Sequence, residues 1–288
     1  MNTLKPYQMK LFKLPFNKLG LQPTNSNVLK HMDKIYNVIL NNYALSTRRD
    51  MLIIFNIVLK SLNQTKAGEI VYKKALELSK EHTDIEYKQC LDPKEKENYV
   101  SYDDLILKVD ELINTYNNDK SKENMINLLI LALYVLHEPI RNNYYNMKII
   151  RNDALDNRID NYLLITNNMY YFIINTDKVS KHTGRIELPV MNKTLRIILD
   201  IYINTYAYNQ TYLFERKPYE PYTKRMFAYK ISNYFKDVGK ILTIHNLRSS
   251  YITNFYKNNL DIVSRNELAV KCRHSREMAE KTYCKYFI

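Results

Sequence analysis

The chain has 288 residues, which is enough to bury a substantial core and to form two domains. Its formal net charge of +13 favours a polyanionic partner such as nucleic acid. No apolar run approaches the roughly 18 residues of a membrane span, and the N-terminus lacks a signal-peptide core. The three cysteines (Cys90, Cys272 and Cys284) have neither metal-ligand spacing nor a paired disulfide pattern. We therefore expect a soluble, intracellular protein that has no membrane contact.

The N-terminal third is predicted to be helical after a basic lead-in. Residues 1–25 carry three prolines and a glycine, and we interpret them as an irregular basic arm. Three stretches with helical periodicity follow, namely Asn27 to Asn42, Thr47 to Asn63 and Ala67 to Glu81. A charged segment that includes Pro93 then separates a helical domain with its linker (26–97) from a second domain (98–288).

The second domain begins with two helices and continues through a small sheet. Ser101 followed by acidic residues predicts a helix start, and Lys122 to Leu136 is a strongly apolar helix that Pro139 ends. A short helix is expected to begin near Arg141. Three strand-like runs follow: Tyr162 to Ile165, Tyr170 to Ile174 and Arg185 to Pro189. The remaining predicted helices are Lys193 to Thr205, Tyr222 to Val238, Ile244 to Asn258, Val263 to Lys271 and Arg276 to Tyr286. The expected fold class is mainly α with a small antiparallel β-sheet.

Four residues near the C-terminus form a chemically suggestive set. His245 and Arg248 lie one helical turn apart, and Tyr283 follows His274 by nine residues. Arginine binds phosphate bidentately, histidine moves protons near neutral pH, and a tyrosyl oxygen is a competent nucleophile. Ser275 is placed to cap the helix that carries the tyrosine. This set has the parts of a site that attacks a phosphodiester.

The sequence His245-Asn246-Leu247-Arg248-Ser249-Ser250, followed by His274-Ser275 and Tyr283, resembles the C-terminal signature of the tyrosine recombinases, the phage-integrase family. The order of predicted elements agrees with that family across residues 25–288. The resemblance implies a core-binding domain in residues 26–97 and a catalytic domain in residues 98–288. It makes Tyr283 the nucleophile, with Tyr251, Tyr256 and Tyr286 as alternatives, of which Tyr286 is the most serious.

The resemblance also implies two further catalytic positions. The first arginine of the family follows the long apolar helix, and Arg141 stands at that place, although the usual T-G-x-R-x-x-E is absent. The family's lysine lies in a hairpin, where Lys178 and Lys181 are nearly equal candidates. In such a site Arg141 and Arg248 bind the phosphate, His245 moves the phenol proton, His274 donates to a phosphate oxygen, and the lysine protonates the leaving group.

The activity implied is cleavage and rejoining of DNA strands through a 3′-phosphotyrosyl intermediate, without metal, nucleotide or other cofactor. Double-stranded DNA is the implied partner, with a monomer in solution and a tetramer on DNA. The composition is rich in Asn, Lys, Ile and Tyr. This composition and the segment Y-V-S-Y-D-D-L are similar to those of recombinases of large DNA viruses and mobile elements. Such an origin would place the protein in a host nucleus or a viral factory.

Two other readings stay open at this stage. A type IB topoisomerase has the same tyrosine chemistry, but that family has a lysine where this chain has His245. A catalytically inactive DNA-binding protein on the same scaffold has no reason to keep every position of the set. A two-metal nuclease is disfavoured because the carboxylates fall chiefly on predicted helix surfaces, where they are solvated.

Overall fold

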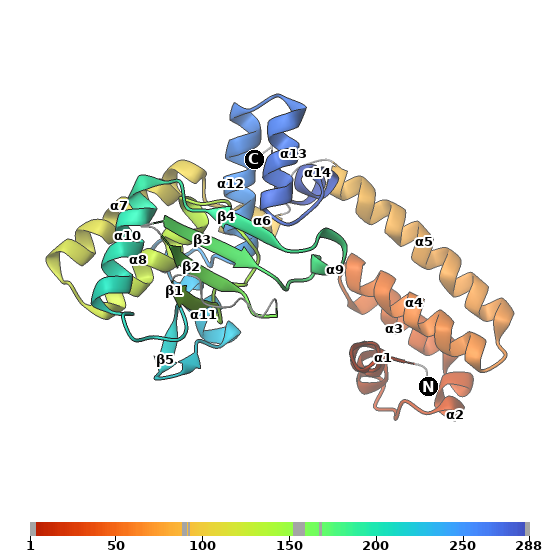
Figure 1. Ribbon diagram of the computed structural model, residues 1–288. Helices are drawn as coiled ribbons and strands as arrows, with labels where there is room; N and C mark the ends of the chain where they lie inside the picture. Colours follow the sequence, from red (N-terminus) through yellow and green to blue (C-terminus); the bar gives the residue numbers. More distant parts are fainter. Residues whose placement is uncertain (1–3, 88–90, 92, 152–158, 167–168, 286–288) are drawn as a thin grey trace. The chain divides into compact units, whose positions relative to one another are not determined.

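A computed structural model of the chain describes residues 4–87, 91, 93–151, 159–166 and 169–285 (Figure 1). The chain divides into two compact units, Met1–Lys88 and Gln89–Ile288. The described residues are mostly helical and include a four-stranded and a two-stranded sheet. The predicted fold class, mainly α with a small sheet, is confirmed. Cys90 and Tyr286 lie outside the described residues.

The first unit is a bundle of helices around one apolar core. Its elements are α1 (Pro6–Lys18), α2 (Asn25–Lys30), α3 (Met32–Asn42), α4 (Leu45–Ser61) and α5 (Thr65–Tyr87). Helix α1 corrects the interpretation of residues 1–25 as an irregular arm. Pro6 takes the first helical position, where a missing N–H costs nothing, and Phe12 and Phe16 bury one face of the helix.

Helices α4 and α5 form the main helical pair of this unit. Asn63 between them adopts a left-handed conformation, with φ of 60°. Gly68 allows a close approach, because a Cβ there would come within 2.9 Å of the Asn56 side-chain oxygen. The expected helix from Asn27 to Asn42 is instead divided between α2 and α3.

The second unit carries the sheets and the remaining helices. Its helices are α6 (Pro93–Asn98), α7 (Tyr102–Asn118), α8 (Lys122–Val135), α9 (Ser180–Thr183), α10 (Lys193–Thr205), α11 (Lys224–Ser232), α12 (Ile244–Asn258), α13 (Ile262–Lys271) and α14 (Arg276–Met278). Two further helical segments are not α-helices: η1 (Lys236–Val238) is a 3₁₀ helix, and η2 (Ala279–Tyr283) is a π-helix. The sequence placed the start of this domain at residue 98. Helix α6 belongs to this compact unit, and its Glu95 lies 4.0 Å from His245 and 3.5 Å from Lys285.

Helix α8 is the centre of this unit. Every residue from Leu128 to Val135 is at most 2% exposed, and α7, α10, α11 and α12 all pack against the helix. A helix that is apolar on all faces needs such a complete cover. The capping residues agree with the sequence, because Ser101 accepts from the Asp104 amide and Ser121 accepts from the Asn124 amide.

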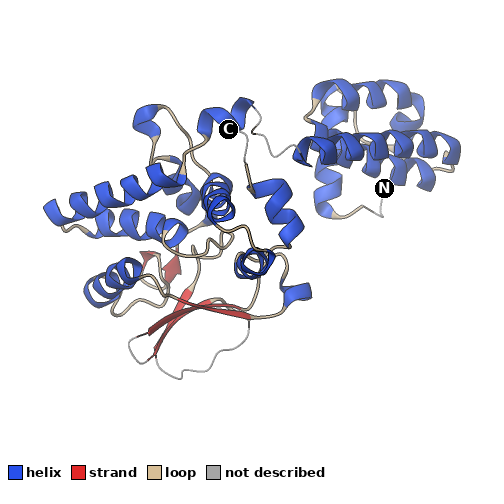
Figure 2. Cartoon of the chain, turned by 90° about the horizontal axis from the view of Figure 1, so that it is seen from above, coloured by secondary structure: helices blue, strands red, loops and turns tan. Residues whose placement is uncertain are grey.

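The four-stranded sheet has the order β1-β2-β3-β4, with β1 (Lys148–Arg151), β2 (Tyr162–Thr166), β3 (Met169–Ile174) and β4 (Ile186–Pro189). Strands β2, β3 and β4 pair antiparallel, as predicted. Strand β1 was not predicted and pairs parallel with β2, so the sheet is mixed. Figure 2 shows the strands at one border of the unit, and the row Leu163, Phe172 and Leu188 faces the main core. A separate two-stranded sheet is formed by β5 (Glu215–Lys217) and β6 (Glu220–Pro221).

Candidate functional site

Helix α12 presents the His-x-x-Arg pair. Thr243 caps the helix with a capping box that involves Asn246, so the first turn has a defined geometry. Arg248 is 1% exposed and donates to the carbonyl of Pro139 and, at 3.0 Å, to the carbonyl of Cys272. Its Nε is buried and has no partner among the described residues. One buried cation therefore ties three segments together and keeps one donor unused.

Arg141 lies in a turn just after the segment that Arg248 holds. The short helix predicted at this point is absent from the described residues, because Arg141 to Asn146 form turns that lead into β1. Arg141 is half-buried, and its guanidinium makes no hydrogen bond or ion pair with any residue that the structure describes. After burial, which is the main cause, its charge helps to lower the pKa values of both His245 and His274, so it lies near both rings. Arg141 is thus a cation available for an external anion.

Tyr283 lies at the end of the π-helix η2 and packs inside this group. Its ring centroid is 5.0 Å from that of His245 and 5.2 Å from that of His274, and the Arg248 guanidinium carbon lies 4.7 Å from it. Ser249 and Thr253 donate to the Tyr283 carbonyl at 2.6 and 3.2 Å. The side chain is 5% exposed, and its hydroxyl has no hydrogen bond to a described residue. The structure thus brings together the tyrosine, both histidines and the second arginine that the sequence selected.

The π-helix corrects the expected helix from Arg276 to Tyr286. Ser275 caps α14 by accepting from the Met278 amide, as predicted. After one short α-turn the chain widens, and the Cys284 amide donates to the carbonyl of Ala279 at 2.8 Å. π-Segments re-aim side chains and occur often at functional sites. Here the wide turn ends on Tyr283.

The alternative tyrosines on α12 belong to or border the same apolar cluster as Tyr283, but their rings and hydroxyls have other partners. The Tyr256 hydroxyl lies 3.5 Å from the carbonyl of Arg265, and the Arg265 guanidinium covers its ring. Tyr251 makes an edge contact with Tyr102, and burial raises its pKa. Among the described residues, neither ring stacks on His245 or His274 or lies under the Arg248 guanidinium.

His274 is a buried histidine with one unused nitrogen. Its Nδ1 lies 3.2 Å from the carbonyl of Ser275, and its Nε2 is buried without a partner among the described residues. Burial and the nearby charges of Arg248 and Arg141 lower its pKa to about 3. The ring is therefore neutral at pH 7, and with Nδ1–H donated to the carbonyl its Nε2 presents a lone pair.

His245 is more exposed and has a carboxylate beside it. Its Nε2 lies 4.0 Å from Glu95 of α6, and the buried Lys285 ammonium lies 3.5 Å from the same carboxylate. Burial lowers the pKa of His245, the Glu95 charge opposes this, and Lys285, Arg248 and Arg141 lower it further. Glu95 and Lys285 were not selected from the sequence, since nothing in their local pattern distinguishes them from other surface charges.

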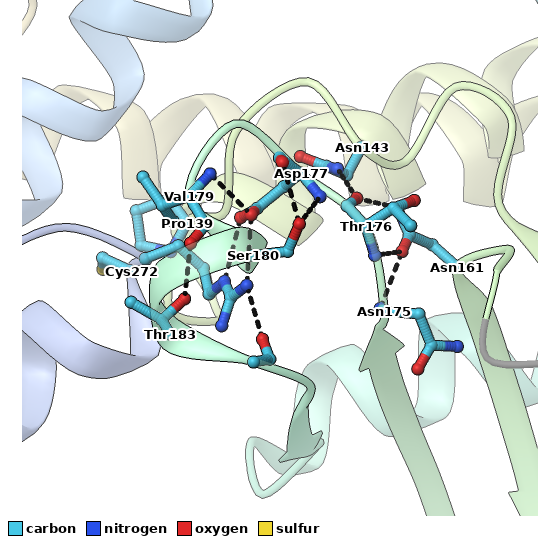
Figure 3. Close-up of polar contacts among 12 residues, drawn as sticks. Pro139, Asn143, Asn161, Asn175, Thr176, Asp177, Val179, Ser180, Thr183 and Cys272 are labelled. Atoms are coloured by element: carbon cyan, nitrogen blue, oxygen red, sulfur yellow. Dashed lines mark hydrogen bonds and ion pairs between the residues drawn. The ribbon is translucent and has the colours of Figure 1, made fainter.

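The two candidate lysines lie in the segment that connects β3 to β4. Lys178 and Lys181 are both exposed, and in the described part of the chain neither bonds to the tyrosine group (His245, Arg248, His274 and Tyr283). The base of their segment is anchored by Asp177, whose carboxylate receives Arg273 at 2.9 and 3.1 Å. Figure 3 shows Asp177 beside Val179 and Ser180. The structure does not choose between the two lysines.

Arg273 and Asp177 are the second pair that the sequence analysis missed. Both side chains are 2% exposed. Burial raises the pKa of Asp177, but hydrogen bonds from Arg273 and the Val179 amide outweigh this and hold the pKa below its usual value. Arg273 has a φ of 61°, a left-handed conformation that costs a residue with a Cβ about 1–2 kcal/mol. Such a residue at a helix end is usually glycine.

Comparison with known proteins finds solved structures of low sequence identity, but no family model and no curated protein. No family model matches the chain, and no curated protein matches its sequence. The XerA recombinase structure is 14% identical with a TM-score of 0.45, over 100% of this chain and 90% of that one. The XerH site-specific recombinase bound to difH in a pre-cleavage complex is 16% identical with a TM-score of 0.45, over 98% and 88%.

A post-cleavage XerH complex on palindromic difH gives 16% identity and a TM-score of 0.47, over 100% of this chain and 88% of that one. At these values the function of this chain has to be inferred from the geometry of its own side chains.

Two further findings concern membrane-spanning helices and metal sites. None of the helices in the described part of the chain is both long and apolar enough to cross a bilayer. The described residues contain no cluster of three or more His, Cys, Asp or Glu side chains suited to a metal ion.

Proposed function

We propose that this chain is a site-specific tyrosine recombinase, which cuts and rejoins DNA strands through a 3′-phosphotyrosyl intermediate. One observation carries the proposal. The Tyr283 ring packs against His245, His274 and Arg248, while buried nitrogens of Arg141, Arg248 and His274 have no partner in the described part of the chain. Buried polar nitrogens without partners are rare in proteins and call for an explanation such as a missing ligand. A phosphodiester has the charge and the acceptors to satisfy the two arginine nitrogens directly, and that of His274 once the ring is protonated.

The two arginines divide the binding of the phosphate. Arg248 is preorganised by the Pro139 and Cys272 carbonyls, so little side-chain entropy is lost when an anion arrives. Arg141 is unpaired among the described residues and can turn its fork to the substrate. Together they supply positive charge as negative charge grows on a pentacoordinate phosphorus.

Both histidines start neutral, but they take different parts in the reaction. A neutral His245, whose lowered pKa favours the free base, accepts the phenol proton as the Tyr283 oxygen attacks. The Nε2 of neutral His274 holds a lone pair, so it donates to a phosphate oxygen only after it takes up a proton. Binding of a phosphate must therefore raise the pKa of His274, and we expect proton uptake when DNA binds.

The chemical step is balanced without a cofactor. The tyrosyl O–P bond forms, the P–O5′ bond breaks, and Lys178 or Lys181 gives a proton to the departing 5′-oxygen. The phosphodiester bond is exchanged rather than hydrolysed, so a 5′-hydroxyl from another strand can reverse the step. This reversal joins strands, which separates a recombinase from a nuclease.

A covalent-trapping experiment tests the proposal. The full chain is incubated, in excess EDTA, with a pool of random-sequence duplexes that carry a nick in one strand. Loss of the short fragment downstream of the cut makes cleavage irreversible. We expect a denaturant-stable adduct whose DNA shares a sequence, because two arginines and a lysine supply the charge that a metal would otherwise give. Cleavage that requires Mg²⁺, or no adduct at all, would overturn the assignment.

The recovered sequence then separates recombinase from topoisomerase. A plasmid carrying two copies of it yields exchanged products with a recombinase, whereas a type IB topoisomerase relaxes supercoils and exchanges nothing. His245 in place of a lysine favours the first outcome. We further propose that the chain is a monomer in solution and assembles to a tetramer on two sites. A DNA-free tetramer in light scattering would contradict that assembly.

A further inference from the structure

The segment that carries Lys178 and Lys181 is held at both ends by one buried guanidinium. At the first end, Arg273 donates from Nε and Nη2 to the two oxygens of Asp177, at 2.9 and 3.1 Å. At the other end, the same Nη2 donates to the carbonyl of Gly184 at 2.8 Å. Residues 178–183, which include the short helix α9, therefore form a closed loop, and the side chain that closes it comes from just after the C-terminal end of α13.

The first end of this loop has further ties. Asn143, two residues after Arg141, donates to the carbonyl of Thr176 at 3.1 Å. Asn161 donates to the same carbonyl at 2.9 Å, and its side-chain oxygen accepts from the Asn175 and Thr176 amides. Figure 3 shows these asparagines beside Thr176. The base of the loop is thus joined to the Arg141 turn and, through Arg273, to His274.

Within the loop, Asp177 also sets the local backbone. Its Oδ1 accepts from the Val179 amide at 2.9 Å, and Ser180 Oγ donates to its carbonyl at 3.0 Å. Lys178 lies inside this turn, between the two anchored residues. The position of the Lys178 backbone is therefore fixed by Asp177, although its own side chain is exposed.

The backbone of Arg273 points to a role for its side chain. Its left-handed conformation at the end of α13 suits glycine, and the Arg273 amide closes the helix on the Val270 carbonyl at 3.0 Å. An arginine in this place strains the backbone, and its side chain makes compensating hydrogen bonds to Asp177 and Gly184, which flank the lysine loop. His274 is the next residue, so any movement of Arg273 reaches the tyrosine group directly.

We propose that Arg273 and Asp177 are a positioning pair, which clamps the lysine loop in register with the His274 and Arg141 segments so that its lysine meets the leaving 5′-oxygen. The proposal rests on the proposed function, since it assigns the pair to the lysine's proton-transfer step. Neither residue touches the phosphate. The pair acts by fixing the backbone position of the lysine. A proton donor that is displaced by about 1 Å loses about 10²-fold in rate.

The test compares two leaving groups on the DNA identified by covalent trapping. One duplex has the normal 5′-oxygen at the cut, and the other has a 5′-bridging sulfur. A thiolate leaves without a proton, so the sulfur substrate does not need the lysine. The double variant Arg273→Gly/Asp177→Asn removes the clamp without stranding a buried charge, and glycine suits the backbone at position 273. The single variant Arg273→Lys keeps the charge but loses the fork.

We expect both variants to cleave the oxygen substrate about 10²-fold more slowly than the wild type and the sulfur substrate within about threefold of it. Thermal unfolding checks that each variant is folded, and amide exchange over residues 176–185 should rise in both. Glu187→Gln, which breaks the exposed Arg185–Glu187 ion pair beside the same loop, is the matched control and should change neither rate.

Equal slowing of both substrates, or no slowing of either, would overturn the clamp. The first result would mean that the pair supports the whole site rather than the lysine. A wild-type chain that forms no adduct with either substrate would instead overturn the proposed function, and the clamp would fall with it.

Discussion

Two parts of the proposed site are held in place by different means. The tyrosine group (His245, Arg248, His274 and Tyr283) is assembled by direct contact, with ring distances of 5.0 and 5.2 Å and a buried cation over the tyrosine. The lysine loop (residues 178–183) has exposed lysines, and Arg273 anchors the residues that flank it, Asp177 and Gly184. Packing fixes the first part, and a polar anchor fixes the second.

The difference separates two kinds of mutational effect. In the tyrosine group, one side chain often serves both stability and chemistry, because removing it opens a packed site. On the lysine loop the two are separable, because the lysine can be removed without disturbing its anchor. The following experiments break or sharpen this comparison, from the largest expected effect to the smallest.

Tyr283→Phe should abolish the covalent adduct with DNA. The ring keeps its packing against both histidines, and the lost hydroxyl has no partner among the described residues, so the free energy of unfolding should change by less than about 0.5 kcal/mol. DNA affinity should persist, since contacts to the phosphate backbone dominate it. A denaturant-stable adduct with the Phe variant would assign the nucleophile to another tyrosine, with Tyr286 the first to test.

Arg248→Ala and Arg141→Ala should lose similar activity but differ in stability. Each removes a phosphate donor, which costs about 10²–10³ in cleavage rate. Arg248→Ala also strands the buried Pro139 and Cys272 carbonyls, lowering the free energy of unfolding by about 2–4 kcal/mol. Arg141→Ala should cost less than about 1 kcal/mol. Urea unfolding of the two variants measures the contrast, and equal losses of stability would show that Arg141 is structural as well.

Lys178→Ala and Lys181→Ala should leave the fold unchanged and separate the two candidates. Removing the lysine that protonates the leaving oxygen should slow cleavage by about 10²–10⁴-fold, and removing the other lysine should slow it by less than about tenfold. A substrate with a sulfur leaving group should restore the cleavage rate only of the variant that lacks the proton-donating lysine. If both variants cleave at the wild-type rate, the proton comes from elsewhere, and the lysine loop has no part in the chemistry.

The smallest effect concerns the pH dependence of stability. His274 has a folded-state pKa of about 3, below its unfolded value of 6.5, so its neutral form stabilises the fold above pH 6.5. That stability is lost as the pH falls from 6.5 towards 3, by roughly 1–2 kcal/mol between pH 6.5 and 5. His274→Gln should flatten the urea-unfolding profile over that range. Part of the slope should remain, because the pKa values of His245 and His137 are lowered too.

The local pattern of the sequence predicted most of the helices and strands of the second unit. Alternating and helical periodicity located β2, β3 and β4 and the helices α7, α8, α10, α11, α12 and α13, whereas the short helix α9 was not predicted. Strand β1 escaped because four residues of the type Lys-Ile-Ile-Arg are too short to establish a period, and its partner lies in parallel across a connection. Helix α1 escaped because prolines were taken as interruptions, whereas Pro6 begins the helix.

The same division holds for the site. The resemblance found the members that have a motif, and the structure brings His245, Arg248, His274 and Tyr283 into one group. The Arg273–Asp177 pair has no sequence signal, because its members are 96 residues apart and each is an ordinary residue in its own neighbourhood. The wide turn before Tyr283 was equally hidden, since the segment has the composition of an α-helix. Contacts between distant segments are what local pattern cannot supply.

The anchoring of the Tyr283 backbone bears on which DNA strand a subunit can cut. Its carbonyl is bonded to Ser249 and Thr253 of the same chain, and its ring rests on that chain's own Arg248. For the proposed reaction the nucleophile is therefore supplied in cis, to the phosphate that its own arginines bind. Cutting then needs no exchange of a segment between neighbours. Under this proposal, a single subunit on a half-site carries the residues required to form the adduct, and pairing with a second site decides where the freed strand is rejoined.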